Sequence, residues 1–86
     1  MKEKKINVLY AVDLEDNTKT SLLALPSGVR CPRELAEKVV RDFFGEYVCD
    51  NDEAVYELIT RAISNDEQID YADWTFFFDE VTFYEL

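Results

Sequence analysis

Apolar residues alternate with polar ones near the start of the chain, in a pattern with a period of two. Every second residue from Ile6 to Val12 is β-branched or aromatic, and Leu9 and Ala11 give the other face an apolar middle. This pattern predicts a strand, and its two apolar faces favour a place at the centre of a sheet. A polar turn over residues 15–18 and a second strand over residues 19–25 complete a predicted hairpin.

The middle of the chain changes to the spacing of helices. Pro32 suits the first helical position because the N–H that it lacks would be unpaired there. An apolar stripe then runs from Leu35 to Phe44, and Gly45 is expected to end this helix. A matching stripe from Ala54 to Ile63 predicts a second helix, which one of the residues Asp50, Asn51 and Asp52 can cap.

The closing segment, residues 70–86, is rich in aromatic residues and carboxylates. It holds seven of the twelve aromatic residues, five carboxylates and no basic residue. We expect one strand here, with a bulge at Asp79–Glu80 that shifts the apolar alternation. The residues expected to face the helices are Trp74, Phe76, Phe78 and either Val81 or Phe83. The residues expected to point to the other face are Thr75, Phe77, Asp79, Thr82 and Tyr84.

These elements predict an α+β fold in the order β-β-α-α-β, with two helices on one face of an antiparallel sheet. We expect residues 1–86 to form a single globular domain, with residues 1–4 frayed. Because two helices cover only one face of such a sheet, Phe77 and Tyr84 are candidates for exposed aromatic residues. Exposed aromatic patches often mark interaction sites.

The formal net charge of −10 is concentrated in the second half of the chain. Residues 1–41 carry eight basic and six acidic residues, whereas residues 42–86 carry thirteen acidic residues and a single base, Arg61. A phosphate backbone repels such a surface, so direct binding of nucleic acid is disfavoured. The same charge attracts proteins that bind nucleic acid through a basic surface, and it also favours solubility.

The composition argues against most catalytic chemistry. The chain has no histidine, which removes imidazole bases and the Ser-His and Cys-His pairs. Gly28 and Gly45 are isolated and match no phosphate-binding loop. The acidic run at 50–53 fails the EF-hand pattern, because Val55 and Arg61 stand where that pattern needs Gly and Glu. We therefore expect no enzymatic activity, no cofactor and no metal site.

The sequence predicts neither a membrane-spanning nor a secreted protein. The longest apolar run, Val8–Val12, is far shorter than the roughly 20 residues that span a bilayer. The lysine-rich start reaches Asn7 and Asp13 too soon for a signal peptide. We expect a cytoplasmic protein in which Cys31 and Cys49 are free thiols, at least one of them buried.

In size, charge and lack of catalytic residues, the chain is similar to small acidic proteins that phages and mobile elements use against host nucleic-acid-binding enzymes. These include DNA mimics, antirestriction proteins and some anti-CRISPR proteins. The resemblance implies a non-enzymatic inhibitor that occupies the basic surface of a nucleic-acid-binding protein. The residues expected to contact this partner are acidic residues of the second half and two aromatic residues: Asp50, Asp52, Asp66, Glu67, Asp70, Asp73, Phe77, Asp79 and Tyr84.

A second hypothesis explains the aromatic residues by self-association. The uncovered sheet face would pair with a second copy of the chain and bury Phe77 and Tyr84 in a homodimer. The acidic surface would then serve solubility alone. The two hypotheses differ in what they predict for the isolated protein, because only the second requires a dimer.

Overall fold

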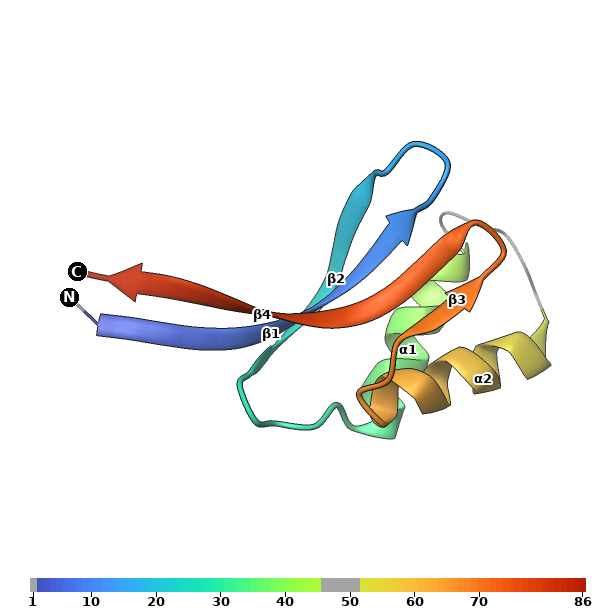
Figure 1. The fold of residues 1–86 in the computed structure, drawn as a ribbon. Coiled ribbons are helices and arrows are strands. Elements are labelled where there is room, and N and C mark those ends of the chain that lie inside the picture. Colours follow the sequence, from blue (N-terminus) through green and yellow to red (C-terminus); the bar gives the residue numbers. More distant parts are fainter. Residues whose placement is uncertain (1, 46–51) are drawn as a thin grey trace.

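The computed structural model describes residues 2–45 and 52–86. The elements in chain order are β1 (Lys2–Asp13), β2 (Lys19–Pro26), α1 (Arg33–Phe43), α2 (Glu53–Ser64), β3 (Ile69–Tyr71) and β4 (Trp74–Glu85). The strands form one antiparallel sheet in the order β2-β1-β4-β3, and both helices lie on one side of it (Figure 1). This confirms the predicted α+β class, the two layers and the inner position of β1.

The structure adds one strand to the predicted order. β3 pairs with the start of β4, from Ile69 opposite Phe76 to Tyr71 opposite Trp74. The turn between these two strands holds Ala72 in the left-handed region, with a φ of 52°. Ile69 and Tyr71 alternate with Asp70, but a pattern this short does not by itself distinguish a strand from a loop.

The predicted bulge at Asp79–Glu80 is wrong. β4 pairs with β1 in an unbroken register that runs from Asp13 opposite Trp74 to Lys2 opposite Glu85. Because side chains alternate strictly along such a strand, Val81 and Phe83 lie on the same face as Phe77. The apolar alternation shifts there because the helices do not cover β4 beyond this point.

The bulge in this sheet lies in β2 instead. Leu9 pairs with Leu23 and Tyr10 pairs with Ser21, so Leu22 is an extra residue without a partner in β1. An extra residue bends the strand and increases its twist. β2 stays paired with β1 on both sides of this bulge and bends with it (Figure 1).

The core lies between the helices and the inner halves of β1 and β4. Phe76 is 1% exposed, and its ring centroid lies 5.4 Å from that of Phe43 and 6.1 Å from that of Phe44. Trp74 and Phe78 pack against the same cluster, which confirms that these three residues of β4 face the helices. Each large aromatic side chain buried in this way contributes on the order of 1.5–3 kcal/mol.

The helices begin close to the predicted positions. Pro32 precedes α1 as its N-cap rather than occupying its first turn, and its φ of −60° is the one that proline imposes. Asp52 is the residue that caps α2, and its Oδ1 accepts hydrogen bonds from the N–H groups of Ala54 and Val55 at 3.0 and 3.4 Å. In the described ranges, 2–45 and 52–86, no helix is long and apolar enough to cross a membrane.

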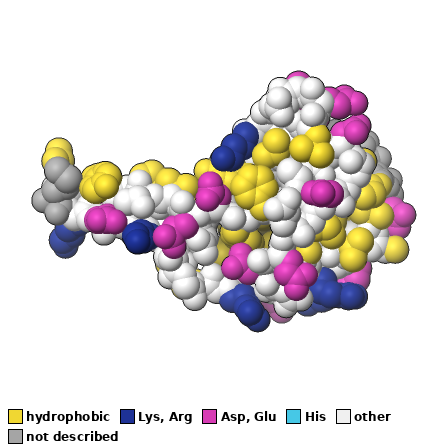
Figure 2. Space-filling model, viewed as in Figure 1, with side chains coloured by type: hydrophobic (Ala, Val, Ile, Leu, Met, Phe, Trp, Pro, Cys, Tyr) yellow, Lys and Arg dark blue, Asp and Glu magenta, His cyan; other side chains and the backbone are white. Residues whose placement is uncertain are grey.

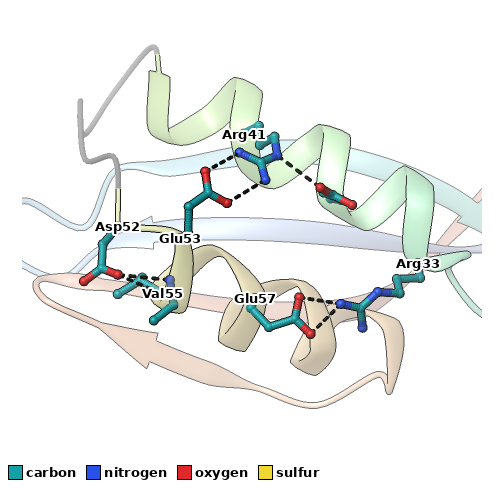
Figure 3. A network of polar contacts seen from close by, with 8 residues as sticks. Arg33, Arg41, Asp52, Glu53, Val55 and Glu57 are labelled. Atoms are coloured by element: carbon teal, nitrogen blue, oxygen red, sulfur yellow. Dashed lines mark hydrogen bonds and ion pairs between the residues drawn. The ribbon is translucent and has the colours of Figure 1, made fainter.

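Ion pairs join the two helices along their exposed side (Figure 3). Arg41 on α1 makes two hydrogen bonds to Glu53 on α2, at 3.0 and 2.8 Å, and Arg33 binds both carboxylate oxygens of Glu57. The arginines lower the pKa of Glu53 and of Glu57, chiefly through these hydrogen bonds. Paired planar groups of this kind fix the register between the helices.

β1 and β4 continue beyond the helices as a two-stranded ribbon, which we call the arm. The arm comprises Lys2–Lys5 and Thr82–Glu85, all exposed, and it carries both chain ends at its tip (Figure 1). Lys4 lies 3.9 Å from Glu85 across it, and Lys5 lies 3.9 Å from Glu80 at its base.

Cys31 is a buried free thiol, as expected for at least one of the two cysteines. Its side chain belongs to the hydrophobic cluster at the start of α1. Burial raises the pKa of the Cys31 thiol, which keeps it protonated and unreactive at neutral pH. Cys49 lies outside the described residues.

Candidate functional site

Two turns that are far apart in the sequence meet at the end of the sheet opposite the arm. The β1–β2 turn follows Asp13, and the β3–β4 turn precedes Trp74, which pairs with Asp13. The N–H of Leu14 donates a hydrogen bond of 2.7 Å to the carbonyl oxygen of Asp73 and joins the two turns. The carboxylates of these turns form what we call the acidic end: Asp13, Glu15, Asp16 and Asp73.

Local hydrogen bonds hold the β1–β2 turn in shape. The Oδ1 of Asp13 accepts from the N–H of Glu15 at 2.9 Å, and the Oδ1 of Asp16 accepts from the N–H of Thr18 at 2.9 Å. Asn17 has a φ of 62°, a conformation that asparagine tolerates better than most residues. The turn is therefore ordered by its own side chains, and its carboxylates keep defined positions.

The carboxylates of the acidic end are close enough to influence one another. The pKa of Glu15 is raised, mainly by the negative charge of Asp73, then by a side-chain hydrogen bond with Asp73, and further by the charges of Asp13 and Asp16. The pKa of Asp16 is lowered instead, because Thr18 donates hydrogen bonds to it. The Glu15–Asp73 approach is a contact between like charges, which disfavours the ionised form.

Several basic residues interact with groups outside the acidic end. Arg33, Arg41 and Arg61 form ion pairs with glutamates of the helices. Lys19 lies over the ring of Tyr10, with its Nζ 3.9 Å from the ring centroid. Within the two described ranges, no Lys or Arg forms an ion pair with the acidic end.

The charge distribution is visible on the surface. Figure 2 shows carboxylates spread over the rounded body, including the tip of the β1–β2 hairpin at the upper right. On the same face, Lys and Arg lie among carboxylates along the arm, where the arm meets the body, and along the lower edge. The positive charges thus lie mostly apart from the hairpin tip, which leaves its field negative.

An exposed apolar residue stands among these carboxylates. Leu14 is 52% exposed, and it lies between Asp13 and Glu15 in the turn. A surface that combines charge with an apolar contact is typical of protein-binding sites, where charge steers the encounter and an apolar side chain anchors the complex. Leu14 is therefore the residue best placed to act as an anchor at this end.

The predicted acidic residues do not form one surface. Asp73 belongs to the acidic end, and Asp70 lies on β3 beside it, where it accepts a hydrogen bond from the Thr75 hydroxyl. Asp66 and Glu67 follow α2, and Asp66 lines a small cavity of about 130 Å³ together with residues such as Arg30, Cys31 and Phe78. Asp52 is occupied as a helix cap at the other end of α2.

The remaining predicted residues also separate. Phe77 lies on the face away from the helices, with its ring centroid 5.9 Å from that of Tyr10, and Asp79 follows on the same face. Tyr84 is on the arm, and the unbroken alternation of β4 turns it to the opposite face from Phe77. The two aromatic residues therefore do not form a single patch. Asp50 lies outside the described residues.

The sheet face away from the helices is hollowed into a shallow groove. The groove encloses about 460 Å³, and its lining is uncharged: Val8, Tyr10, Ser21, Leu22, Leu23, Ala24, Val81 and Phe83. Val8 is only 8% exposed, and it lines this groove together with the apolar residues of β2 and β4. The groove is an apolar surface separate from the acidic end.

Sequence reasoning missed the contribution of the β1–β2 turn. From the sequence, residues 13–17 could be interpreted only as a polar turn. Their proximity to Asp73 depends on the β3–β4 hairpin, which was not predicted. An exposed leucine between two carboxylates was the one local indication that the turn has more than a linking role.

The described residues contain no group of three or more Cys, Asp or Glu side chains arranged to hold a metal ion. Comparison of the chain with protein-family models, with curated proteins and with solved structures gave no match.

Proposed function

We propose that this protein is a non-enzymatic binding module whose acidic end occupies the basic surface of a nucleic-acid-binding protein. One observation carries the proposal: two distant turns bring Glu15 close enough to Asp73 for Asp73 to raise the pKa of Glu15, and no Lys or Arg of the described residues forms an ion pair with either carboxylate. Like charges held together destabilise the isolated protein, and a basic partner relieves that repulsion. The helices show the opposite arrangement, with Glu53 and Glu57 both paired to arginine.

The acidic end also has the form that fast, charge-steered binding requires. Glu15, Asp16 and Asp73 are exposed, and the backbone hydrogen bond between Leu14 and Asp73 holds the two turns together. A fixed set of negative charges raises the association rate with a basic surface. Leu14 supplies the apolar contact that would slow dissociation.

The test compares two double charge reversals that change the net charge equally. Glu15→Lys with Asp73→Lys reverses the acidic end, whereas Glu34→Lys with Asp42→Lys reverses two exposed carboxylates of α1. Immobilised wild-type protein should retain a nucleic-acid-binding protein from cell lysate at low salt. High salt or added DNA or RNA should release that protein, because both compete with the carboxylates.

The acidic-end variant should lose this capture, and the α1 variant should keep it. Circular dichroism of both variants establishes that each remains folded. Equal loss in the two variants would show that net charge, not this surface, governs binding. Retention by the acidic-end variant would contradict the proposal outright.

A further inference from the structure

The sheet has two long open edges, and they differ in how well they are protected against pairing. β2 forms one edge, where it carries Lys19 at its start, Pro26 at its end and the extra residue Leu22 in its middle. A lysine, a proline and a bulge are the devices by which natural edge strands avoid pairing with other chains. The β2 edge is therefore blocked.

The edge of β4 has none of these three devices. β3 covers only the segment from Trp74 to Phe76, and no other described strand pairs with that side of β4 from Phe77 to Glu85. This segment contains no proline and no basic residue, and its register with β1 is unbroken. It presents a row of backbone N–H and C=O groups that no described strand pairs with, the arrangement that accepts an added strand.

We propose that a second copy of this chain pairs with the Phe77–Glu85 edge, antiparallel to it, about a two-fold axis at Val81. A two-fold interface brings the same edge from both copies together. Val81 is the middle residue of this edge, so an axis there pairs every residue of the edge with a residue of the second copy. Phe77 then lies opposite Glu85, and Glu85 lies opposite Phe77.

The positions of the carboxylates favour this register. With the axis at Val81, Asp79 lies opposite Phe83 of the second copy, and Glu80 lies opposite Thr82. Each carboxylate therefore faces an uncharged residue. Direct opposition of like charges destabilises a strand pair, and this register avoids it although the segment holds three carboxylates.

Neighbouring registers bring carboxylates together. An axis at Glu80 places that residue opposite its own copy, and an axis at Asp79 does the same for Asp79. An axis at Thr82 places Asp79 opposite Glu85. The charges along this edge therefore permit the complete pairing and disfavour these three slipped registers.

Pairing of this kind would join the two four-stranded sheets edge to edge through their β4 strands, with the helices of both copies on one side. The two acidic ends would lie at opposite ends of the assembly, because β4 of the second copy runs the other way. Trp74 lies seven residues from the axis in each copy, so the ends would be roughly 45 Å apart at about 3.3 Å per residue. The inference rests on the edge alone and does not depend on the proposed function.

The decisive experiment combines sedimentation with cysteine crosslinking. In a background with Cys31→Ala and Cys49→Ala, Val81→Cys places one thiol on each side of the axis. Directly opposite residues of antiparallel strands have Cα atoms about 4.5–5.5 Å apart, which lies inside the range of a disulfide. Ser21→Cys, an exposed position on the blocked β2 edge, is the matched control.

We expect wild-type protein to sediment with a doubled mass as its concentration rises. Mild oxidation should convert Val81→Cys to a covalent dimer and leave Ser21→Cys monomeric. Hydrogen exchange should slow at the amides of 77–85 in the dimer, relative to dilute protein.

Three results would overturn the inference. These are a wild-type protein that stays monomeric at high concentration, equal crosslinking of the two cysteine variants, and a dimer whose 77–85 amides gain no protection. None of these results bears on the charge-reversal test of the acidic end, so either proposal can be contradicted without the other.

Discussion

The two halves of the β1–β4 ribbon share one unbroken register but have opposite environments. In the inner half, Leu9 and Phe76 are each 1% exposed, whereas in the outer half Phe83 is 48% and Tyr84 is 68% exposed. The backbone pairing is the same in both halves, so pairing does not explain the difference. On the face that carries Phe76 and Tyr84, coverage by the helices explains it, since α1 and α2 pack against the inner half only (Figure 1). Phe83 lies on the other face, where it lines the groove beside Val81.

The comparison shows that this sheet is longer than its core. The arm has large apolar side chains that stay exposed, Phe83 at 48% and Tyr84 at 68%. Its two cross-strand ion pairs are also exposed, each with 3.9 Å between the Lys Nζ and a Glu carboxylate oxygen. Exposed pairs at this distance stabilise a ribbon only weakly, and isolated two-stranded ribbons are marginal in water. A second copy along β4 would give the arm the third and fourth strands that it lacks.

The largest expected difference between the halves is the cost of removing an aromatic ring. Phe76→Ala should lower the free energy of unfolding by about 3–5 kcal/mol, because it leaves a cavity among Phe43 and Phe44. Phe83→Ala should change it by less than about 0.5 kcal/mol, since the ring is half exposed. Urea unfolding in dilute protein measures both without a contribution from dimers.

Similar losses in the two variants would show that the arm shares the core's stability. That outcome would remove the distinction between body and arm on which the comparison rests. If Phe76→Ala does not fold at all, Phe76→Leu supplies a milder variant with the same expected order.

A smaller difference is expected for two aspartates. Asp52→Ala removes the cap of α2 and should cost about 0.5–2 kcal/mol, typically about 1. Asp79→Ala removes an exposed carboxylate on the outer half and should be neutral within about 0.5 kcal/mol. Thermal unfolding of the two variants, at equal and low protein concentration, measures both losses of stability. It shows whether a carboxylate stabilises the fold through its hydrogen bonds or through its charge alone.

The smallest expected effect is a change in the pH dependence of stability. The folded pKa of Glu57 is lowered by Arg33, so its contribution is present above the unfolded pKa and is lost as pH falls through the folded value. The folded pKa of Glu15 is raised by Asp73, so the folded state binds protons more readily and is destabilised as pH rises through that window.

Glu57→Gln should therefore flatten the loss of stability in acid, and Glu15→Gln should raise stability slightly near neutral pH. Unfolding measured from acid to neutral pH follows both. If the stability of the two variants changed with pH in the same way, Glu57 beside Arg33 and Glu15 beside Asp73 would not have pKa values shifted in opposite directions.

Much of the fold could be predicted from local patterns. The helical stripes from Leu35 and from Ala54 and the alternation around Tyr10 identified the long elements, because an amphipathic period reflects the side that packs on a core. The inner position of β1 followed from its two apolar faces. The α+β arrangement followed from that order of elements.

The candidate site could be predicted only in part. Asp73 was among the residues predicted from the sequence, but Glu15, which interacts with it, was not. Their proximity depends on β3, a strand of only three residues that is defined by its pairing with β4. The cap of α2 was narrowed to three residues, and only the backbone geometry selected Asp52. The shift of apolar residues at Asp79 was misread as a bulge, although it marks the edge of the helix layer.

The sequence by itself determined the long elements, the acidity and the poverty of catalytic groups, since each is a property of composition or of a local period. The tertiary structure alone decided which carboxylates meet, which half of the ribbon is covered, and which sheet edge stays open. These depend on contacts between residues far apart in the chain. No local pattern records such contacts, because the free energy that selects them comes from packing the whole domain.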